Sequence, residues 1–206
     1  MLRVWGRVNS VNVKKVMWCA GELGVPFERI EAGMEHGLVG TPEYQAMNPN
    51  ARVPTIDDDG FVLWESNAIV RYLSLKYSLG KLCPEDYGQR ADSDRWMDWS
   101  TAQLAPTFRE VFWGTVRTAP EKRDLPFIEK NRVATAKTLD VVDTLFAKRQ
   151  FVAGDRLTMG DIPLGCYVHL WMSMPIERPA HPNLTAYHKR LLERPAFNAW
   201  VNTPLS

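Results

Sequence analysis

The chain has 206 residues, of which 45% are hydrophobic and 24% are charged, so it can bury the core of one globular domain or of two small ones. Its net charge of +1 excludes a general attraction to nucleic acid or to an anionic membrane surface. No apolar run approaches the roughly 18 residues of a membrane span, so we expect neither nucleic acid nor a membrane as a partner.

Strand and helix signals alternate at the start of the chain. Leu2–Trp5 predicts a short strand, and apolar residues at helical spacing then predict a helix that ends at Leu23, before Gly24. Pro26–Ile30 predicts a second strand. A β-hairpin is predicted further on, with strands over Pro54–Ile56 and Phe61–Trp64 on either side of an Asp-Gly turn.

The composition changes after the helix that Ser66 is expected to cap. Gly80, Pro84 and Gly88 predict a linker, and beyond it the signals are only helical. Long amphipathic helices are predicted over residues 89–113 and 127–149. The sequence thus predicts an α/β domain, a linker and an all-helical domain, over residues 1–79, 80–87 and 88–206.

The three cysteines, Cys19, Cys83 and Cys166, lack the C-x-x-C or metal-ligand spacing of a redox or zinc site. Cys19 and Cys166 fall in apolar helical runs, so we expect them to be core residues rather than nucleophiles. A reduced, cytoplasmic protein with no bound metal is the expectation.

Residues 48–72, "NPNARVPTIDDDGFVLWESNAIVRY", contain N-P-x-x-x-V-P-x-(L/I) followed by E-S-x-A-I-x-x-Y. This pairing resembles the glutathione transferase family, and the similarity extends to "LTMGDI" and "HPNLTAYHKRLLERPAF" near the end of the chain. The resemblance implies a thioredoxin-like α/β domain of order β-α-β-α-β-β-α, followed by an all-α helical bundle. It also implies glutathione as co-substrate and a homodimer.

The resemblance assigns roles around the Val-Pro pair. In the family the matching bond is cis, and the turn there frees the N–H and C=O of Val53 to pair with an extended peptide such as glutathione. The alternative is that Pro54 merely starts a strand. The glycyl carboxylate of glutathione has two candidate partners, Arg52 and His36, which could equally be solvated; Val39 and Gly40 stand where many relatives carry a His or Lys.

Glu65 and Ser66 are expected to hold the γ-glutamyl end of glutathione. The free N–H groups and dipole of a helix N-terminus favour an anion at Ser66, and the carboxylate of Glu65 would pair with an ammonium. The resemblance implies both roles. The alternative for Ser66 is a plain N-cap.

Ser10 and Asn12 lie in a predicted strand-to-helix turn, where small polar side chains either cap the helix or hold a ligand. In the serine-type family members (theta-like and phi-like), a Ser six residues before an apolar helical residue contacts the glutathione sulfur, and Ser10 and Val16 keep that spacing. In some bacterial relatives an Asn two residues later shares this task, as Asn12 could. The turn contains no Cys or Tyr, which argues against the omega, beta, alpha, mu and pi types.

Further residues have expected roles in the helical part. We expect Trp113 to line a cleft between the domains, and Trp96 and Trp99 to pack the first long helix from one face. Thr158 and Asp161 form a capping-box pattern, so Asp161 is expected to serve folding rather than catalysis.

The resemblance predicts an enzyme that adds the glutathione thiolate to a small hydrophobic electrophile. Two alternatives stay open: a glutathione-dependent oxidoreductase for disulfides or peroxides, and a non-catalytic protein that binds apolar ligands.

Overall fold

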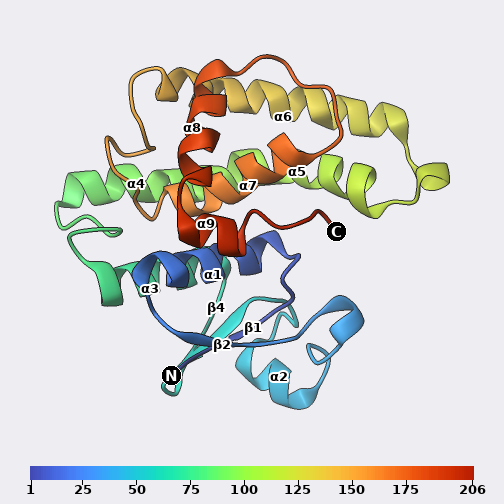
Figure 1. Ribbon diagram of the computed structural model, residues 1–206. Helices are drawn as coiled ribbons and strands as arrows, with labels where there is room; N and C mark the ends of the chain where they lie inside the picture. The colour runs from blue at the N-terminus through green and yellow to red at the C-terminus, as the bar shows by residue number, and fades with distance from the viewer.

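Four short strands form one mixed sheet at the start of the chain in the computed structural model, which describes residues 1–206 (Figure 1). The strands are β1 (Leu2–Trp5), β2 (Phe27–Ile30), β3 (Thr55–Asp58) and β4 (Phe61–Trp64). Their order in the sheet is β2-β1-β3-β4, with β1 parallel to β2 and the other neighbours antiparallel. The hairpin turns at Asp59 and Gly60, which both have positive φ, as a tight two-residue turn requires.

Three α-helices complete this part of the fold, α1 (Val11–Leu23), α2 (Pro42–Met47) and α3 (Ser66–Ser78). A short 3₁₀ turn, η1 (Met34–His36), precedes α2. The predicted order β-α-β-α-β-β-α is confirmed, and Gly24 ends α1 with a φ of 64°. Three strand boundaries were wrong. β2 and β3 begin one residue later than predicted, after Pro26 and Pro54, which have no backbone N–H to donate to a ladder, and β3 continues past Ile56 to Asp58.

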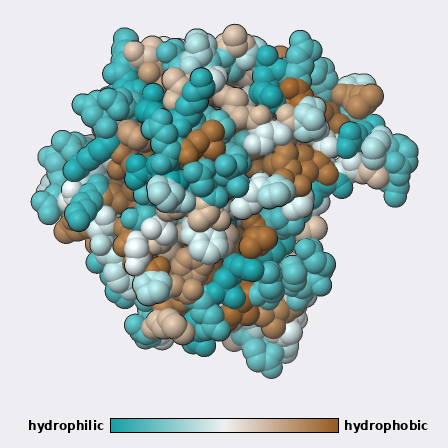
Figure 2. Space-filling view, viewed as in Figure 1, coloured by the Kyte–Doolittle hydropathy of each residue, from teal (hydrophilic) through white to brown (hydrophobic).

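Only helices follow. They are α4 (Tyr87–Trp99), η2 (Ser100–Leu104), α5 (Ala105–Phe112), η3 (Trp113–Arg117), η4 (Pro120–Lys122), α6 (Leu125–Phe146), α7 (Asp161–Ser173), α8 (Pro182–Leu192) and α9 (Pro195–Trp200). The sheet and this helical part lie on opposite sides of α1 and α3 (Figure 1). None of the helices combines the length and the apolar character that a membrane crossing requires. Hydrophilic residues cover much of the face in Figure 2, with separate hydrophobic patches between them.

The helix predicted over residues 89–113 differs from the structure in two ways. It begins earlier, because Asp86 caps α4 by accepting a hydrogen bond from the N–H of Gln89 at 2.8 Å, so Gly88 lies inside the helix rather than in the linker. It is also interrupted by the π-helical turn η2. Pro106 lies in the first turn of α5 and has no N–H for the preceding turn, which accounts for the wider backbone there.

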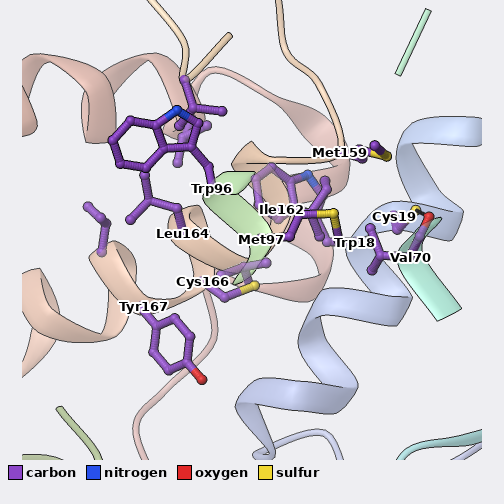
Figure 3. Close-up of a cluster of buried hydrophobic side chains, with 14 of the residues drawn as sticks. Trp18, Cys19, Val70, Trp96, Met97, Met159, Ile162, Leu164, Cys166 and Tyr167 are labelled. Carbon is purple, nitrogen blue, oxygen red and sulfur yellow. Dashed lines mark hydrogen bonds between the residues drawn. The ribbon is translucent and has the colours of Figure 1, made fainter. Parts of the chain in front are cut away.

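A single large hydrophobic cluster joins the two parts of the chain. It includes Trp18 and Cys19 of α1, Val70 of α3, and Met97 and Cys166 of the helical part, as Figure 3 shows. Helix α1 is therefore covered on both sides, by α3 and the sheet and by α7 and α9. Burial on all sides explains why this helix, with its modest apolar stripe, has eight buried residues in succession from 13 to 20.

Asp161 is the first residue of α7, and the N-cap is Gly160 rather than Thr158, which the capping-box pattern had predicted. Its carboxylate accepts hydrogen bonds from the N–H groups of Val152 and Thr158, at 3.0 and 2.8 Å, and from the hydroxyl of Tyr187 at 3.2 Å. The carboxyl is fully buried, and burial raises its pKa to about 6.

Candidate active site

A cleft of about 750 Å³ lies between the first turns of α1 and α3 on one side and the segment from α4 to η3 on the other. Four residues predicted for the site line it together, Ser10, Asn12, Glu65 and Ser66. The apolar residues of its lining come mainly from the helical part: Ala102, Ala105, Phe108, Phe112, Trp113 and Leu170. The cleft thus has a polar wall and an apolar wall, contributed by different parts of the chain.

Ser10 occupies the N-cap position of α1 without acting as a side-chain cap. Its backbone C=O accepts the first helical hydrogen bond, from the N–H of Lys14 at 2.9 Å, but its hydroxyl makes no cap hydrogen bond. The residue is only 8% exposed, and the accessible part belongs to the cleft. A hydroxyl that is free of the backbone can donate to a ligand at the positive end of the helix dipole.

Asn12 is held by two side chains. Its Oδ1 accepts a hydrogen bond from the Nζ of Lys15 at 2.9 Å and another from the hydroxyl of Ser66 at 3.3 Å. Lys15 is 2% exposed, and its Nζ also lies 4.8 Å from the centre of the Tyr167 ring. Because Oδ1 is engaged on both sides, the Nδ2 donor of Asn12 is the group left for other partners.

The start of α3 differs from the expectation by one residue. Glu65, not Ser66, is the N-cap residue, with a φ of 71° that a non-glycine residue rarely adopts. Neither residue caps the helix with its side chain; the Ser66 hydroxyl donates to Asn12 instead. Asn67 donates to the C=O of Met97 at 2.8 Å, while its Oδ1 is buried without a partner. The carboxylate of Glu65 and this oxygen offer two acceptors for a cation.

The Val53–Pro54 bond is cis, as expected. The backbone N–H and C=O of Val53 make no hydrogen bond within the protein, so both are free to pair with an extended peptide. Neither Arg52, Val53 nor Pro54 lines the cleft itself. The side chain of Val53 nevertheless reaches Gly33, where an added Cβ would lie 3.4 Å from its Cγ1 and 3.2 Å from the Nη1 of Arg7.

The two candidates for the glycyl carboxylate lie in different surroundings. Arg52 is exposed, and the structure gives its side chain no hydrogen-bond partner. The Nε2 of His36 lies 3.4 Å from carboxylate oxygens of both Glu31 and Glu35. An imidazole that already has two carboxylate neighbours is a weak site for a further anion.

Trp113 lines the cleft as predicted and is 45% exposed. Trp96 and Trp99 pack edge to face, with ring centroids 5.4 Å apart, and lie outside the lining. Cys19 and Cys166 are fully buried, and burial raises the pKa of each thiol to about 12. Neither cysteine can supply a thiolate near neutral pH.

Five basic residues of the cleft lining were not predicted from the sequence: Arg7, Lys15, Arg71, Arg109 and Arg117. Lys15 follows Lys14, and two adjacent lysines in a helix ordinarily indicate a solvated helix face. Its burial follows from the covering of α1 by the helical part, which no local pattern reveals. Arg117 follows the predicted helix end and had no signal at all.

Two family models match the chain. Residues 1–74 match the model described as "Glutathione S-transferase, N-terminal domain", and residues 104–195 match "Glutathione S-transferase, C-terminal domain". The chain belongs to the glutathione S-transferase family. The fold, the class of enzyme and glutathione as the co-substrate, which the resemblance implied, are thereby confirmed at the level of the family.

Similar proteins are bacterial and plant glutathione transferases. Glutathione S-transferase GstB of Escherichia coli (strain K12) is 38% identical over 208 residues, covering 100% of both chains. Glutathione S-transferase 3 of Zea mays is 30% identical over 210 residues, covering 97% of this chain and 93% of the relative. The crystal structure of the theta class glutathione S-transferase from Xanthomonas axonopodis pv. citri with glutathione bound matches with a TM-score of 0.97 at 46% identity, covering 100% of this glutathione transferase and 99% of that chain.

Proposed function

We propose that this protein binds glutathione along the polar wall of the cleft and adds its thiolate to a small hydrophobic electrophile. The observation that carries the proposal is the Ser10 hydroxyl, which lies at the N-terminus of a 13-residue helix, in the cleft, without a capping bond. A thiol with an ordinary pKa is mostly protonated at neutral pH, and the thiolate is the nucleophile. A hydrogen bond and positive potential at the sulfur lower that pKa, and the thiol proton passes to solvent.

The rest of the tripeptide follows from the sulfur position. The γ-glutamyl carboxylate would accept hydrogen bonds from the N–H of Ser66 and the other free N–H groups at the start of α3. Glu65 and the Oδ1 of Asn67 would take the ammonium. The cysteinyl backbone would pair with the free N–H and C=O of Val53. Asn12, which touches Ser66, would support the sulfur end through its Nδ2.

The electrophile would bind against the apolar wall. The apolar wall offers the aromatic rings of Phe108, Phe112 and Trp113. The turn η2 adds Ala102 to the same lining. Small side chains leave room there, and aromatic rings bind flat apolar compounds well.

A homodimer in the cytoplasm completes the proposal. The edge strand β4 exposes Phe61 and Val62, and the neighbouring helix α3 exposes Leu75 and Tyr77. Apolar side chains on an edge strand favour coverage by a partner. The mass in solution, measured by light scattering after gel filtration, tests this part, and a monomer at micromolar concentration would contradict it.

The activity is tested by comparing glutathione-dependent turnover of chlorodinitrobenzene with that of a small disulfide. Conjugation of the aromatic compound, slowed in Ser10→Ala at neutral pH, supports the proposal. Turnover of the disulfide alone would point to a glutathione-dependent oxidoreductase. Tight binding of hydrophobic dyes without any turnover would point to a ligand-binding protein.

A further inference from the structure

Two of the four arginines that line the cleft have no Asp or Glu partner. Arg71 pairs with Asp94 and Asp98, and Arg109 pairs with Glu110. Arg7 and Arg117 form no ion pair with an Asp or Glu, and the Nη2 of Arg117 donates to main-chain oxygens of Asn9 and Ser206, at 3.1 and 2.7 Å. The guanidinium of Arg7 also donates no hydrogen bond to any protein atom, and its Nε is buried.

The two guanidiniums without an Asp or Glu partner are neighbours. Arg7 reaches the Cβ position of Gly33, and the Nη1 of Arg117 lies 3.1 Å from the Sδ of the next residue, Met34. Burial lowers the pKa of Arg7, and so does the positive charge of Arg117; the nearby Glu35 acts in the opposite direction but forms no ion pair with either. Two like charges held together in a half-buried place are unfavourable unless an anion joins them.

Both arginines are tied to the turn that carries Ser10. The N–H of Ser10 donates to the C=O of Arg7 at 3.2 Å, and the Nη2 of Arg117 donates to the C=O of Asn9 at 3.1 Å. The guanidinium of Arg117 is oriented by the Trp113 ring, whose centre lies 5.4 Å from its Cζ. An anion between the two arginines would therefore lie close to the sulfur that Ser10 is proposed to hold.

We propose that Arg7 and Arg117 form a subsite for a carboxylate or similar oxyanion, and that the electrophile of this enzyme carries that group close to its reacting carbon. Planar guanidiniums suit carboxylates because they donate two parallel hydrogen bonds. The inference rests on the proposed function and narrows its substrate class to small anionic electrophiles. The glycyl carboxylate of glutathione is the other possible source of the same group.

Chloroacetate and chloroacetamide form a matched pair that differs in charge. With either one, the glutathione thiolate attacks the methylene carbon, a C–S bond forms, the C–Cl bond breaks, and chloride leaves with the electron pair. Chloride release gives kcat/KM for each compound. The ratio of kcat/KM for chloroacetate to that for chloroacetamide is then divided by the ratio of the rate constants of their uncatalysed reactions with glutathione. We expect this normalised preference to fall by about 10-fold or more in Arg7→Gln and in Arg117→Gln.

Arg95→Gln is the control variant, because it removes the same charge from an arginine outside the cleft with a side chain 62% exposed. It should leave the preference unchanged. If Arg7→Gln instead raises the KM for glutathione with chloroacetamide and keeps the preference, the group bound is the glycyl carboxylate and the claim about the electrophile is overturned. If neither quantity changes, the whole subsite is overturned.

A binding measurement separates this inference from the proposed function. Anilinonaphthalene sulfonate and neutral phenylnaphthylamine are titrated by fluorescence without glutathione, so the result does not depend on turnover. A wild-type protein that turns over no electrophile would contradict the proposed function. Weaker binding of the sulfonate alone in Arg7→Gln, by about 10-fold, would still support the oxyanion subsite, and equal binding would overturn it.

Discussion

The hydroxyl of Ser66 donates a hydrogen bond to the Oδ1 of Asn12, 3.3 Å away and 54 residues earlier in the chain. This contact joins the N-termini of α3 and α1, the two helix ends that face the cleft. Lys15 donates to the same oxygen. The part of the cleft proposed for the γ-glutamyl end is thereby connected through one amide to the part proposed for the sulfur.

Ser10→Ala should raise the pKa of enzyme-bound glutathione and slow conjugation at neutral pH. A hydrogen bond to a charged group is worth about 1.5–3 kcal/mol, which corresponds to roughly 10- to 150-fold in rate. Part of the loss should return at high pH, where the thiol ionises unaided. Thiolate absorbance, titrated with pH for wild type, Ser10→Ala and Asn12→Ala, measures this. If the pKa of bound glutathione shifts in Asn12→Ala alone, Asn12 and not Ser10 is the main contact to the sulfur. If it shifts in neither variant, the turn has only a structural role.

Lys15→Met should also raise the pKa of the bound thiol, by less than Ser10→Ala. The change removes a buried cation next to the cleft and releases Asn12 from one of its two hydrogen bonds. Lys14→Met is the matched control, because Lys14 is equally buried but donates to the C=O of Val201 at 3.1 Å, away from Asn12. Equal shifts of the thiol pKa in the two variants would show that the Asn12 contact is irrelevant.

Glu65→Gln should weaken glutathione binding far more than it slows the chemistry of bound substrate. The carboxylate lies at the start of α3 and is proposed to contact the ammonium rather than the sulfur, so this contact is the same before and during the reaction. A loss of about 1.5–3 kcal/mol is expected and should appear in the KM for glutathione with kcat nearly unchanged. Glu43→Gln, an exposed position on α2, serves as the control. An unchanged KM in Glu65→Gln would contradict the placement of the tripeptide.

Asp161 should make folding stability depend on pH. Burial raises its pKa from 3.8 to about 6, so between these values the folded protein binds more protons than the unfolded chain. The free energy of unfolding therefore falls as pH rises through this window, and the effect should be absent from Asp161→Asn. Urea unfolding of both proteins from about pH 4 to about pH 6 measures the difference. Parallel pH curves would mean that burial does not shift this carboxyl.

Much of the fold could be predicted because its signals are local. The strand Leu2–Trp5 has the predicted bounds, and α1 ends at Gly24, where a residue without a Cβ adopts positive φ at low cost. The Asp-Gly dipeptide placed the hairpin turn for the same reason. Each of these features depends on the conformational preferences of a few consecutive residues.

The polar residues of the cleft were found by another route, through the resemblance of residues 48–72 to a known family. That pattern pointed to Glu65, Ser66 and the Val-Pro turn, and the spacing of Ser10 pointed to the sulfur. The local pattern alone favoured capping at Ser10 and Ser66, and the structure shows neither side chain capping its helix. Capping preference predicts how often a serine occurs at a helix end. The hydrogen-bond partner of its hydroxyl depends on which residues the tertiary structure places next to it.

Only the tertiary structure decided which basic side chains lie in the cleft without an Asp or Glu partner. Arg7, Lys15 and Arg117 line one cleft because α1 packs between the sheet and the helical part, and because η3 brings residue 117 back to the turn at Asn9. The sequence by itself determined the order of the elements and the polar side chains at two helix starts. Long-range packing brings together residues more than 100 positions apart, such as Asn9 and Arg117. Short-range periodicity and turn chemistry concern only neighbouring residues, so they do not predict such contacts.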